Sequence, residues 1–190
     1  SLIGQKKPEI ANDYLVKFSR LIRAYMESSI KSSKLLAGSI LENENSIKEE
    51  IDMLKTYMEL EKMKYPENKV KFDIEVENDS ILNRSIPPMI LQPFVENAIK
   101  HGILPKDGAG TVIVRFEQNE ETLICKIIDD GIGREKSAQN KEKSIQANKS
   151  RGLQLIVNRV KLLNELNYNI KIDFEDPESG GTIVIITIQN

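Results

Sequence analysis

The sequence predicts an α+β protein, in which one β-sheet is covered on one face by helices and is preceded by an α-helical hairpin. Apolar residues recur at helical spacing as far as Pro66 and alternate like a strand from Val70 onwards. The 190 residues are 39% hydrophobic and 29% charged, which suits a globular protein with one full core. We therefore divide the chain into a helical part, 1–66, and a sheet-containing part, 67–190.

Composition argues against several classes of protein. A formal net charge of −2 and the absence of Trp argue against a nucleic-acid-binding face. The single cysteine, Cys125, excludes an internal disulfide, and with one histidine, His101, a His/Cys zinc site is disfavoured. No apolar run reaches the roughly 18 residues of a membrane span, and no signal peptide is visible. Because the first residue is Ser rather than Met, we expect a piece of a longer protein whose membrane anchor lies upstream.

The first helix is expected over residues 8–27, with Pro8 in its first turn. Its apolar stripe consists of Ile10, Tyr14, Phe18, Leu21 and Tyr25. Residues 28–45 are rich in Ser and Lys and are expected to form a connection.

The second helix is expected between Ser46 and Pro66. Ser46 and Glu49 form a capping box, in which the hydroxyl and the carboxylate satisfy free amide groups of the first turn. Its stripe consists of Ile47, Ile51, Leu54 and Met58. Because two amphipathic helices cannot bury both stripes alone, we expect a second copy to complete a four-helix bundle. The alternative is packing against the rest of the same chain.

The remainder of the chain mixes strands and helices. Strands are expected at 70–76, 111–117, 122–128, 170–174 and 182–188. Helices are expected at 91–102 and 152–167, and the last two strands form a hairpin around Gly180 and Gly181. Residues 134–151 hold almost nothing apolar and are expected to be a mobile loop.

The stretch LQPFVENAIKHG, residues 91–102, places Asn97, Lys100 and His101 on one helical face. The opposite side is expected to bury against the sheet and carries Ile90, Phe94, Ala98 and Ile99. An Asn carbonyl is a hard oxygen that suits Mg²⁺, and a Lys can meet a phosphate as a point charge. A merely solvated polar face is the alternative.

The stretch IIDDGIG, residues 127–133, ends an apolar strand with two carboxylates. A carboxylate such as Asp129 at a strand end can accept a hydrogen bond from the exocyclic amine of adenine. Gly131 and Gly133 allow a tight turn and a close approach of a ligand to the backbone. A simple Asp-Gly turn is the alternative.

The stretch NKSRGLQLIV, residues 148–157, places basic residues before a glycine that opens a helix. Free amide groups at the helix start, together with Lys149 and Arg151, make a reasonable phosphate cradle. The alternative is a capped surface helix with ordinary flanking charges.

The order of these segments resembles the GHKL ATP-binding fold of sensor histidine kinases, gyrase-type ATPases and anti-sigma kinases. The N box, G1 box, G2 box and final Gly-Thr strand of that family read here PFVENAIKHG, DDGIG, SRGLQL and GGT. This resemblance covers about 67–190 and implies a Bergerat α/β sandwich with a mixed sheet.

A closer resemblance covers nearly the whole chain. The stretches SIKEEIDMLKTYMELEKMKY, IPPMILQPFVENAIKHG and KSRGLQLIVNRVKLLN are similar to the LytS-like class of sensor histidine kinases. Residues 1–66 would then be a truncated dimerisation domain that lacks the phosphoacceptor histidine.

The resemblance implies ATP and Mg²⁺ as cofactors and assigns roles to the motif residues. Asn97 would hold Mg²⁺ against the ATP phosphates, Lys100 and His101 would line the phosphate side, and Asp129 would read the adenine amine. Residues 134–151 would be the ATP lid. The other implied ATP-binding residues are Gly131, Gly133, Lys149, Ser150, Arg151, Gly152, Leu153 and Thr182.

Two positions depart from the family pattern. Ser150 stands where the first glycine of the G2 box is expected, so the geometry around the phosphates is open. Pro93 stands one turn before Asn97, where the ATPases and anti-sigma kinases place a general-base Glu. Glu96 is adjacent to Asn97 and lies about 100° from it around the helix. It is the one candidate catalytic residue. We therefore expect slow hydrolysis of ATP by water.

The implied function is that of a protein histidine kinase catalytic domain in a two-component phosphorelay. The γ-phosphoryl group would pass to a histidine upstream of Ser1 and then to an aspartate of a response regulator. His101 is thus not the acceptor, and this chain is not expected to phosphorylate itself. The implied location is a cytoplasmic domain, with the full-length protein anchored in the bacterial inner or cell membrane through an upstream segment.

A second interpretation is a degenerate GHKL domain that acts as a non-catalytic interaction or dimerisation module. Ser150 and the missing acceptor histidine are its only support. Nucleotide affinity separates the two interpretations.

Overall fold

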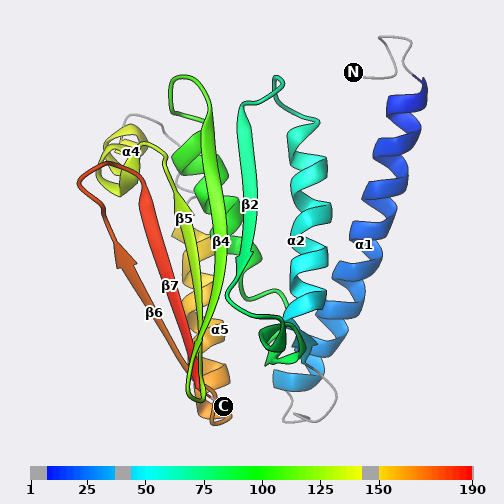
Figure 1. Cartoon of the computed structure of the whole chain (residues 1–190), viewed down its shortest axis with the longest axis vertical. Helices are drawn as coiled ribbons and strands as arrows, with labels where there is room; N and C mark the ends of the chain where they lie inside the picture. The colour runs from blue at the N-terminus through cyan, green and yellow to red at the C-terminus, as the bar shows by residue number, and fades with distance from the viewer. Residues whose placement is uncertain (1–7, 37–43, 143–149, 190) are drawn as a thin grey trace.

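The computed structural model describes residues 8–36, 44–142 and 150–189 (Figure 1). Within these residues a twisted sheet stands beside two long helices, and further helices cover one face of the sheet. The predicted α+β class is confirmed.

The hairpin consists of α1 (Pro8–Leu36) and α2 (Ile47–Lys62), which run antiparallel (Figure 1). The predicted capping box is present. Ser46 Oγ accepts the Glu49 amide at 3.2 Å, and the Glu49 carboxylate accepts the Ser46 amide at 2.7 Å. The predicted stripe of α2 is buried at Ile47, Ile51, Leu54 and Met58. The second helix therefore forms as the sequence predicts.

The prediction that residues 28–45 form a connection is wrong over 28–36, which continue α1. The reason is tertiary contact with α2 and the residues before it. The buried Ser28 hydroxyl donates to Met53 Sδ at 3.2 Å. Lys31 Nζ donates to Asn45 Oδ1 at 3.0 Å and pairs with the Glu49 carboxylate at 3.1 Å. Local composition does not reveal these partners.

The stripe predicted for α1 is only partly buried. Leu21 is buried, while Tyr14 and Tyr25 pack partly buried against the core. Phe18 is 44% exposed in the single chain, which agrees with the expectation that the hairpin alone does not bury both stripes. The side chain of Ile10 lies outside the described residues.

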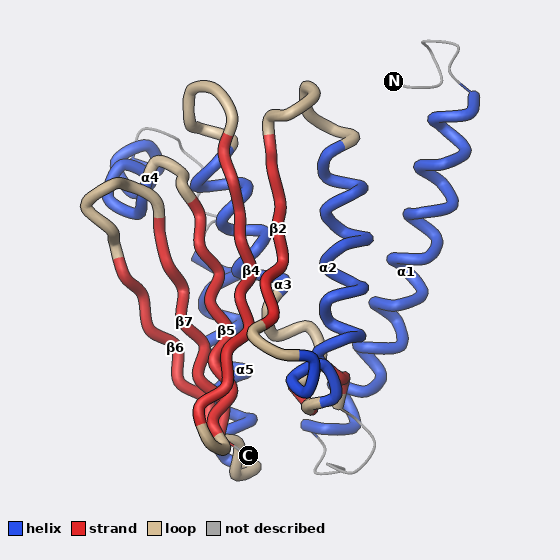
Figure 2. Tube along the Cα trace, in the orientation of Figure 1, coloured by secondary structure: helices blue, strands red, loops and turns tan. Residues whose placement is uncertain are grey.

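The main sheet has five strands in the order β2-β4-β5-β7-β6, seen side by side in Figure 2. Their bounds are β2 (Val70–Val76), β4 (Gly110–Asn119), β5 (Thr122–Asp129), β6 (Asn169–Glu175) and β7 (Thr182–Gln189). β2 pairs parallel with β4, and the other pairs are antiparallel, so the sheet is mixed. All five predicted strands and the final hairpin are confirmed.

Short elements that the sequence did not predict complete the connections. β1 (Asn45–Ser46) and β3 (Ser85–Ile86) form a small two-stranded sheet. A 3₁₀ helix, η1 (Asp79–Asn83), follows β2. Two- to five-residue elements carry too little periodicity to be seen in a sequence.

The predicted helix at 91–102 consists of α3 (Gln92–Asn97) and a π-helical segment, η2 (Ala98–Ile103). Leu104 N–H donates to Ile99 O at 2.9 Å, the five-residue spacing of a π turn. Its predicted apolar side is buried, and η2 contacts β4 and β5. The predicted helix at 152–167 is α5 (Ser150–Glu165), which lies behind the sheet in Figure 1.

The prediction of a mobile loop over 134–151 is wrong for its first part, which is helix α4 (Gly133–Glu142), and for residues 150–151, which begin α5. This helix has no apolar stripe, so hydrophobic periodicity gives no signal for it. Residues 143–149 lie outside the described residues.

Candidate functional site

A pocket of about 180 Å³ lies between the α3–η2 helix, the end of β5, the start of α4 and the β6–β7 hairpin. Five residues singled out in the sequence line it: Asn97, His101, Asp129, Gly133 and Thr182. They come from four separate elements. The fold thus brings residues of the N box, the G1 box and the Gly-Thr strand to one cavity.

Asp129 is the buried acid of this pocket. It ends β5 opposite Thr182 of β7 and is 6% exposed. Its Oδ1 accepts the Gly131 amide at 2.9 Å. Burial raises the pKa of Asp129 to about 6; the Gly131 amide opposes the rise and the Asp130 charge adds to it. Asp129 is therefore a buried hydrogen-bond acceptor in this pocket.

Two glycines allow the helix to approach the Asp129 loop. A methyl carbon built on Gly102 would lie 2.6 Å from Asp129 Oδ1, and one on Gly131 would overlap the Gly102 backbone. Ile132 N–H donates to Gly102 O at 3.1 Å and joins the two segments. Gly102 lines the pocket but was not predicted as a site residue. Its position directly after His101 in the motif is the only signal in the sequence.

Asp130, the neighbour of Asp129, bonds to the segment before β4 and to its first residues rather than lining the pocket. Its Oδ1 accepts the Thr111 amide at 2.8 Å and pairs with Lys106 Nζ at 3.1 Å. Lys106 also donates to the Asp130 carbonyl at 2.7 Å. Asp130 therefore anchors the turn, and only the first carboxylate of the DDG motif lines the pocket.

The three polar residues of the predicted helix face do not lie together. Asn97 and His101 line the pocket, but Lys100 does not. The Lys100 ammonium pairs with the Glu96 carboxylate at 2.9 Å, and Gln92 Nε2 donates to the other Glu96 oxygen at 3.0 Å. In a π turn, the residue four positions after Asn97 lies closer to the same helical face than the residue three positions after it. His101 therefore shares the pocket with Asn97, whereas Lys100 does not.

The residues of the G2 box are described only by their backbone. Ser150, Arg151, Gly152 and Leu153 form the first turn of α5, and their side chains lie outside the described residues, as does all of Lys149. Gly131 does not line the pocket, but it stands against Gly102 and Asp129, which do.

The outer wall of the pocket contains residues that the sequence analysis missed. Arg134 of α4 lies over the Phe174 ring of β6, 5.1 Å from its centroid, and both line the pocket. Arg134 Nε also donates to Asp176 at 2.8 Å. The alternation of β6 places Phe174 on the face of Ile170, so strand periodicity could have found it. The partnership with Arg134 could not be found in this way.

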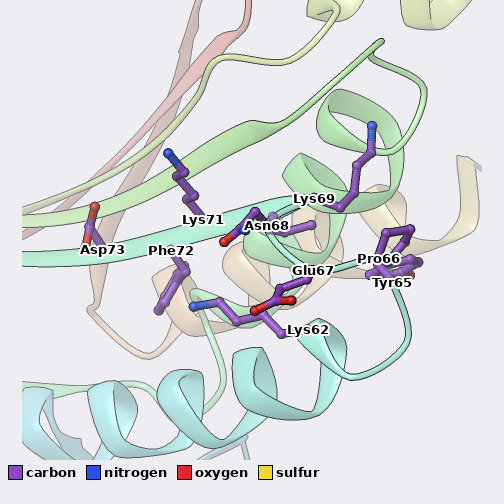
Figure 3. Close-up of a pocket in the computed structure, with 10 residues that line it drawn as sticks. Lys62, Tyr65, Pro66, Glu67, Asn68, Lys69, Lys71, Phe72 and Asp73 are labelled. Carbon is purple, nitrogen blue, oxygen red and sulfur yellow. The ribbon is translucent and has the colours of Figure 1, made fainter.

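A second hollow of about 430 Å³ lies between the end of α2 and β2 (Figure 3). Its lining consists of Lys62 and residues 65–73, and includes none of the predicted site residues. Lys69 Nζ donates to the carbonyls of Lys106 and Gly108, both at 2.6 Å, and ties the turn to the loop before β4.

Among the described residues, no group of three or more His, Cys, Asp or Glu side chains could hold a metal ion. None of the described helices has the length and apolarity that a membrane crossing requires.

Family models match both parts of the chain. The model described as histidine kinase-, DNA gyrase B- and HSP90-like ATPase matches residues 85–190, more than half of the chain, and a histidine kinase model matches 1–69. The chain belongs to the histidine kinase-, gyrase B- and HSP90-like ATPase family. This confirms the predicted GHKL fold and the ATP-binding catalytic domain.

Several individual relatives are named as sensor kinases. Sensor protein LytS of Oceanobacillus iheyensis is 25% identical over 94% of this chain and 29% of its own length. Sensor histidine kinase YpdA of Escherichia coli is 29% identical over 82% of this chain and 25% of its own length. The predicted resemblance to LytS-like sensor histidine kinases is confirmed, and the chain spans well under half of these relatives.

Solved structures agree on the fold. Histidine kinase AdeS of Acinetobacter baumannii aligns with a TM-score of 0.54 at 14% identity, covering 95% of this chain and 84% of that one. At this identity the likeness concerns the fold alone.

Proposed function

We propose that this chain is the ATP-binding part of a two-component sensor histidine kinase and that adenine binds at Asp129. The observation that carries the proposal is a buried carboxylate in a pocket that also contains Asn97 and His101. Such a carboxylate accepts a hydrogen bond from the exocyclic amine of adenine, and burial makes that bond selective.

The size of the pocket supports a ring system rather than a whole nucleotide. Its volume of about 180 Å³ is below the roughly 300–1,000 Å³ of pockets for drug-sized ligands. The phosphates would therefore extend beyond it, towards Asn97, His101 and the first turn of α5. Lys149, Ser150, Arg151, Gly152 and Leu153 remain proposed phosphate-side residues.

Asn97 is the proposed Mg²⁺ ligand. One amide oxygen suits Mg²⁺, which takes most of its shell from water and substrate phosphates rather than from a protein cage. The absence of an acidic cluster among the described residues is compatible with this mode. When bound, Mg²⁺ neutralises charge that develops on the transferring phosphoryl group.

The proposed reaction is transfer of the γ-phosphoryl group to a histidine upstream of this chain, and then to a response regulator aspartate. The chain's own residues would position ATP. Glu96 is held by Gln92 and Lys100, and Pro93 cannot act as a base, which supports slow hydrolysis by water. His101 lines the pocket and is not proposed as the acceptor.

The proposed dimer uses α1. Its exposed apolar face carries Leu15, Phe18, Ile22, Met26 and Ile30, at spacings of three and four residues. α2 already packs within the chain, so this face of α1 is the surface that a second copy would cover in a four-helix bundle. Anchoring of the full-length protein in a membrane is proposed through an upstream segment.

The test is calorimetric titration with a non-hydrolysable ATP analogue, with and without Mg²⁺. We expect Mg²⁺ to tighten binding in the wild type. We expect Asp129→Asn to weaken binding at least about tenfold, because it removes a hydrogen bond to a charged group that contributes about 1.5–3 kcal/mol. Asp73→Asn is the matched control, because Asp73 is exposed on β2 and does not line the pocket. Absence of binding by folded wild-type protein would favour the interaction-module interpretation instead.

A further inference from the structure

The turn that leads into α3 is held from two sides by charged side chains. Met89 precedes α3 and has a left-handed backbone, with φ +57°. This conformation is uncommon for a non-glycine residue and costs free energy that neighbouring contacts can offset. These contacts come from α2 of the hairpin and from α5.

The contact from the hairpin is made by Glu50. This residue of α2 is 1% exposed, and its Oε1 accepts the Met89 amide at 2.7 Å. The same oxygen accepts Asn45 Nδ2 at 2.7 Å, and Asn45 Nδ2 also lies 3.3 Å from Ser28 Oγ of α1. A buried chain of hydrogen bonds therefore runs from α1 through Asn45 and Glu50 to Met89.

The contact from the other side is made by Arg159 of α5. Its guanidinium donates to the carbonyl of Pro88 and, at 3.4 Å, to that of Met89. Burial raises the pKa of Glu50, whereas its bonds to Met89 and Asn45 and the charge of Arg159 oppose the rise. The two charges thus attract each other across the turn.

The elements that meet at this turn are the ones that flank the pocket. α3 begins three residues after Met89 and carries Asn97, and α5 begins with the G2 box nine residues before Arg159. In Figure 1 the segment between β2 and α3 lies beside the start of α2. A single turn therefore links both α5 and the hairpin to the start of the pocket helix.

We propose that Glu50 and Arg159 are positioning residues that couple the hairpin to the nucleotide pocket through the Pro88–Met89 turn. This inference rests on the proposed nucleotide binding. Coupling is reciprocal. Nucleotide held by α3 and the start of α5 stabilises the contact between the hairpin and the Pro88–Met89 turn, and this contact raises nucleotide affinity by the same factor.

The test combines titration of the ATP analogue with amide hydrogen exchange on the whole chain. In the wild type we expect nucleotide to slow exchange at Met89 and at the start of α2. Arg159→Met keeps the apolar stem but removes both donors. It should weaken affinity about tenfold and abolish the nucleotide-dependent protection at Met89. Arg159→Lys should restore part of both effects.

Two controls separate coupling from loss of structure. Lys161→Met makes a similar change at an exposed site on the same helix and should leave both readouts unchanged. Glu50→Gln keeps an acceptor for the Met89 amide and should retain most of the protection, whereas Glu50→Ala should lose it.

The outcomes distinguish this inference from the function on which it rests. Wild-type protein that binds nucleotide without added protection at Met89, or Arg159→Met protein that binds as tightly as the wild type, would overturn the coupling alone. Wild-type protein that does not bind nucleotide would overturn both.

Discussion

The buried charge of Asp129 lowers the free energy of unfolding of the protein. Its carboxylate is buried beside the Asp130 charge, and its pKa is raised from 3.8 to about 6. Between these two values the folded state binds more protons than the unfolded state, so the free energy of unfolding falls as pH rises through this window. A carboxylate kept in a destabilising position indicates a role in binding.

Asp129→Asn should therefore stabilise the protein without nucleotide. The amide oxygen can still accept the Gly131 amide, while the buried charge is gone. We expect a gain of about 1–3 kcal/mol near neutral pH, because one pKa unit corresponds to about 1.4 kcal/mol. Urea unfolding at about pH 7.5 and about pH 4.5 checks this. The gain should shrink at the lower pH, and a variant less stable than the wild type at both would contradict it.

Gly102→Ala should damage both the fold and the pocket. The added methyl carbon would lie 2.6 Å from Asp129 Oδ1, so the helix or the loop must move. We expect a loss of about 1–3 kcal/mol in stability and loss of ATP-analogue binding, as for other overpacked sites. Gly108→Ala is the control: its φ of +76° costs stability, but it has open space and does not line the pocket. Undiminished binding by Gly102→Ala would be the contrary result.

At the scale of elements, a helix is predictable when its cap and apolar stripe are local features of the sequence, and not when contacts with distant residues support it. α2 was predicted correctly because its cap and stripe are local features of the sequence. The last part of α1 was missed because it is supported by bonds from Ser28 and Lys31 to residues 25 and 14 positions further along the chain. α4 was missed because it lacks an apolar stripe.

The exposed face of α1 leads to a prediction about assembly. Replacing Ile22 and Met26 by Gln should weaken self-association, because both apolar side chains are exposed at 41% and 62% and α1 keeps its contacts to α2 through Leu21. Sedimentation velocity over a range of concentrations measures the effect. Replacing Lys34, exposed at the far end of α1, by Gln is the control. Wild-type protein that is monomeric at all concentrations would contradict the proposed dimer.

At the scale of the whole molecule, the strands of the sheet were predictable from the sequence. The contacts between separate elements around the pocket were not. Alternating residues located all five strands, and the motif order indicated the fold that the family models confirm. The split of Asn97 from Lys100 depends on a π turn, and the pairing of Arg134 with Phe174 depends on contact between distant segments. Neither can be read from local spacing.

The central claim is that the buried Asp129 carboxylate reads the amine of adenine. The most direct measurement compares the affinity for ATP with that for inosine triphosphate, in which a carbonyl replaces this amine. We predict that the wild type prefers ATP at least about tenfold, because a hydrogen bond to a charged group contributes about 1.5–3 kcal/mol. Asp129→Asn should lose the preference. Equal affinity of the wild type for both nucleotides would contradict the claim.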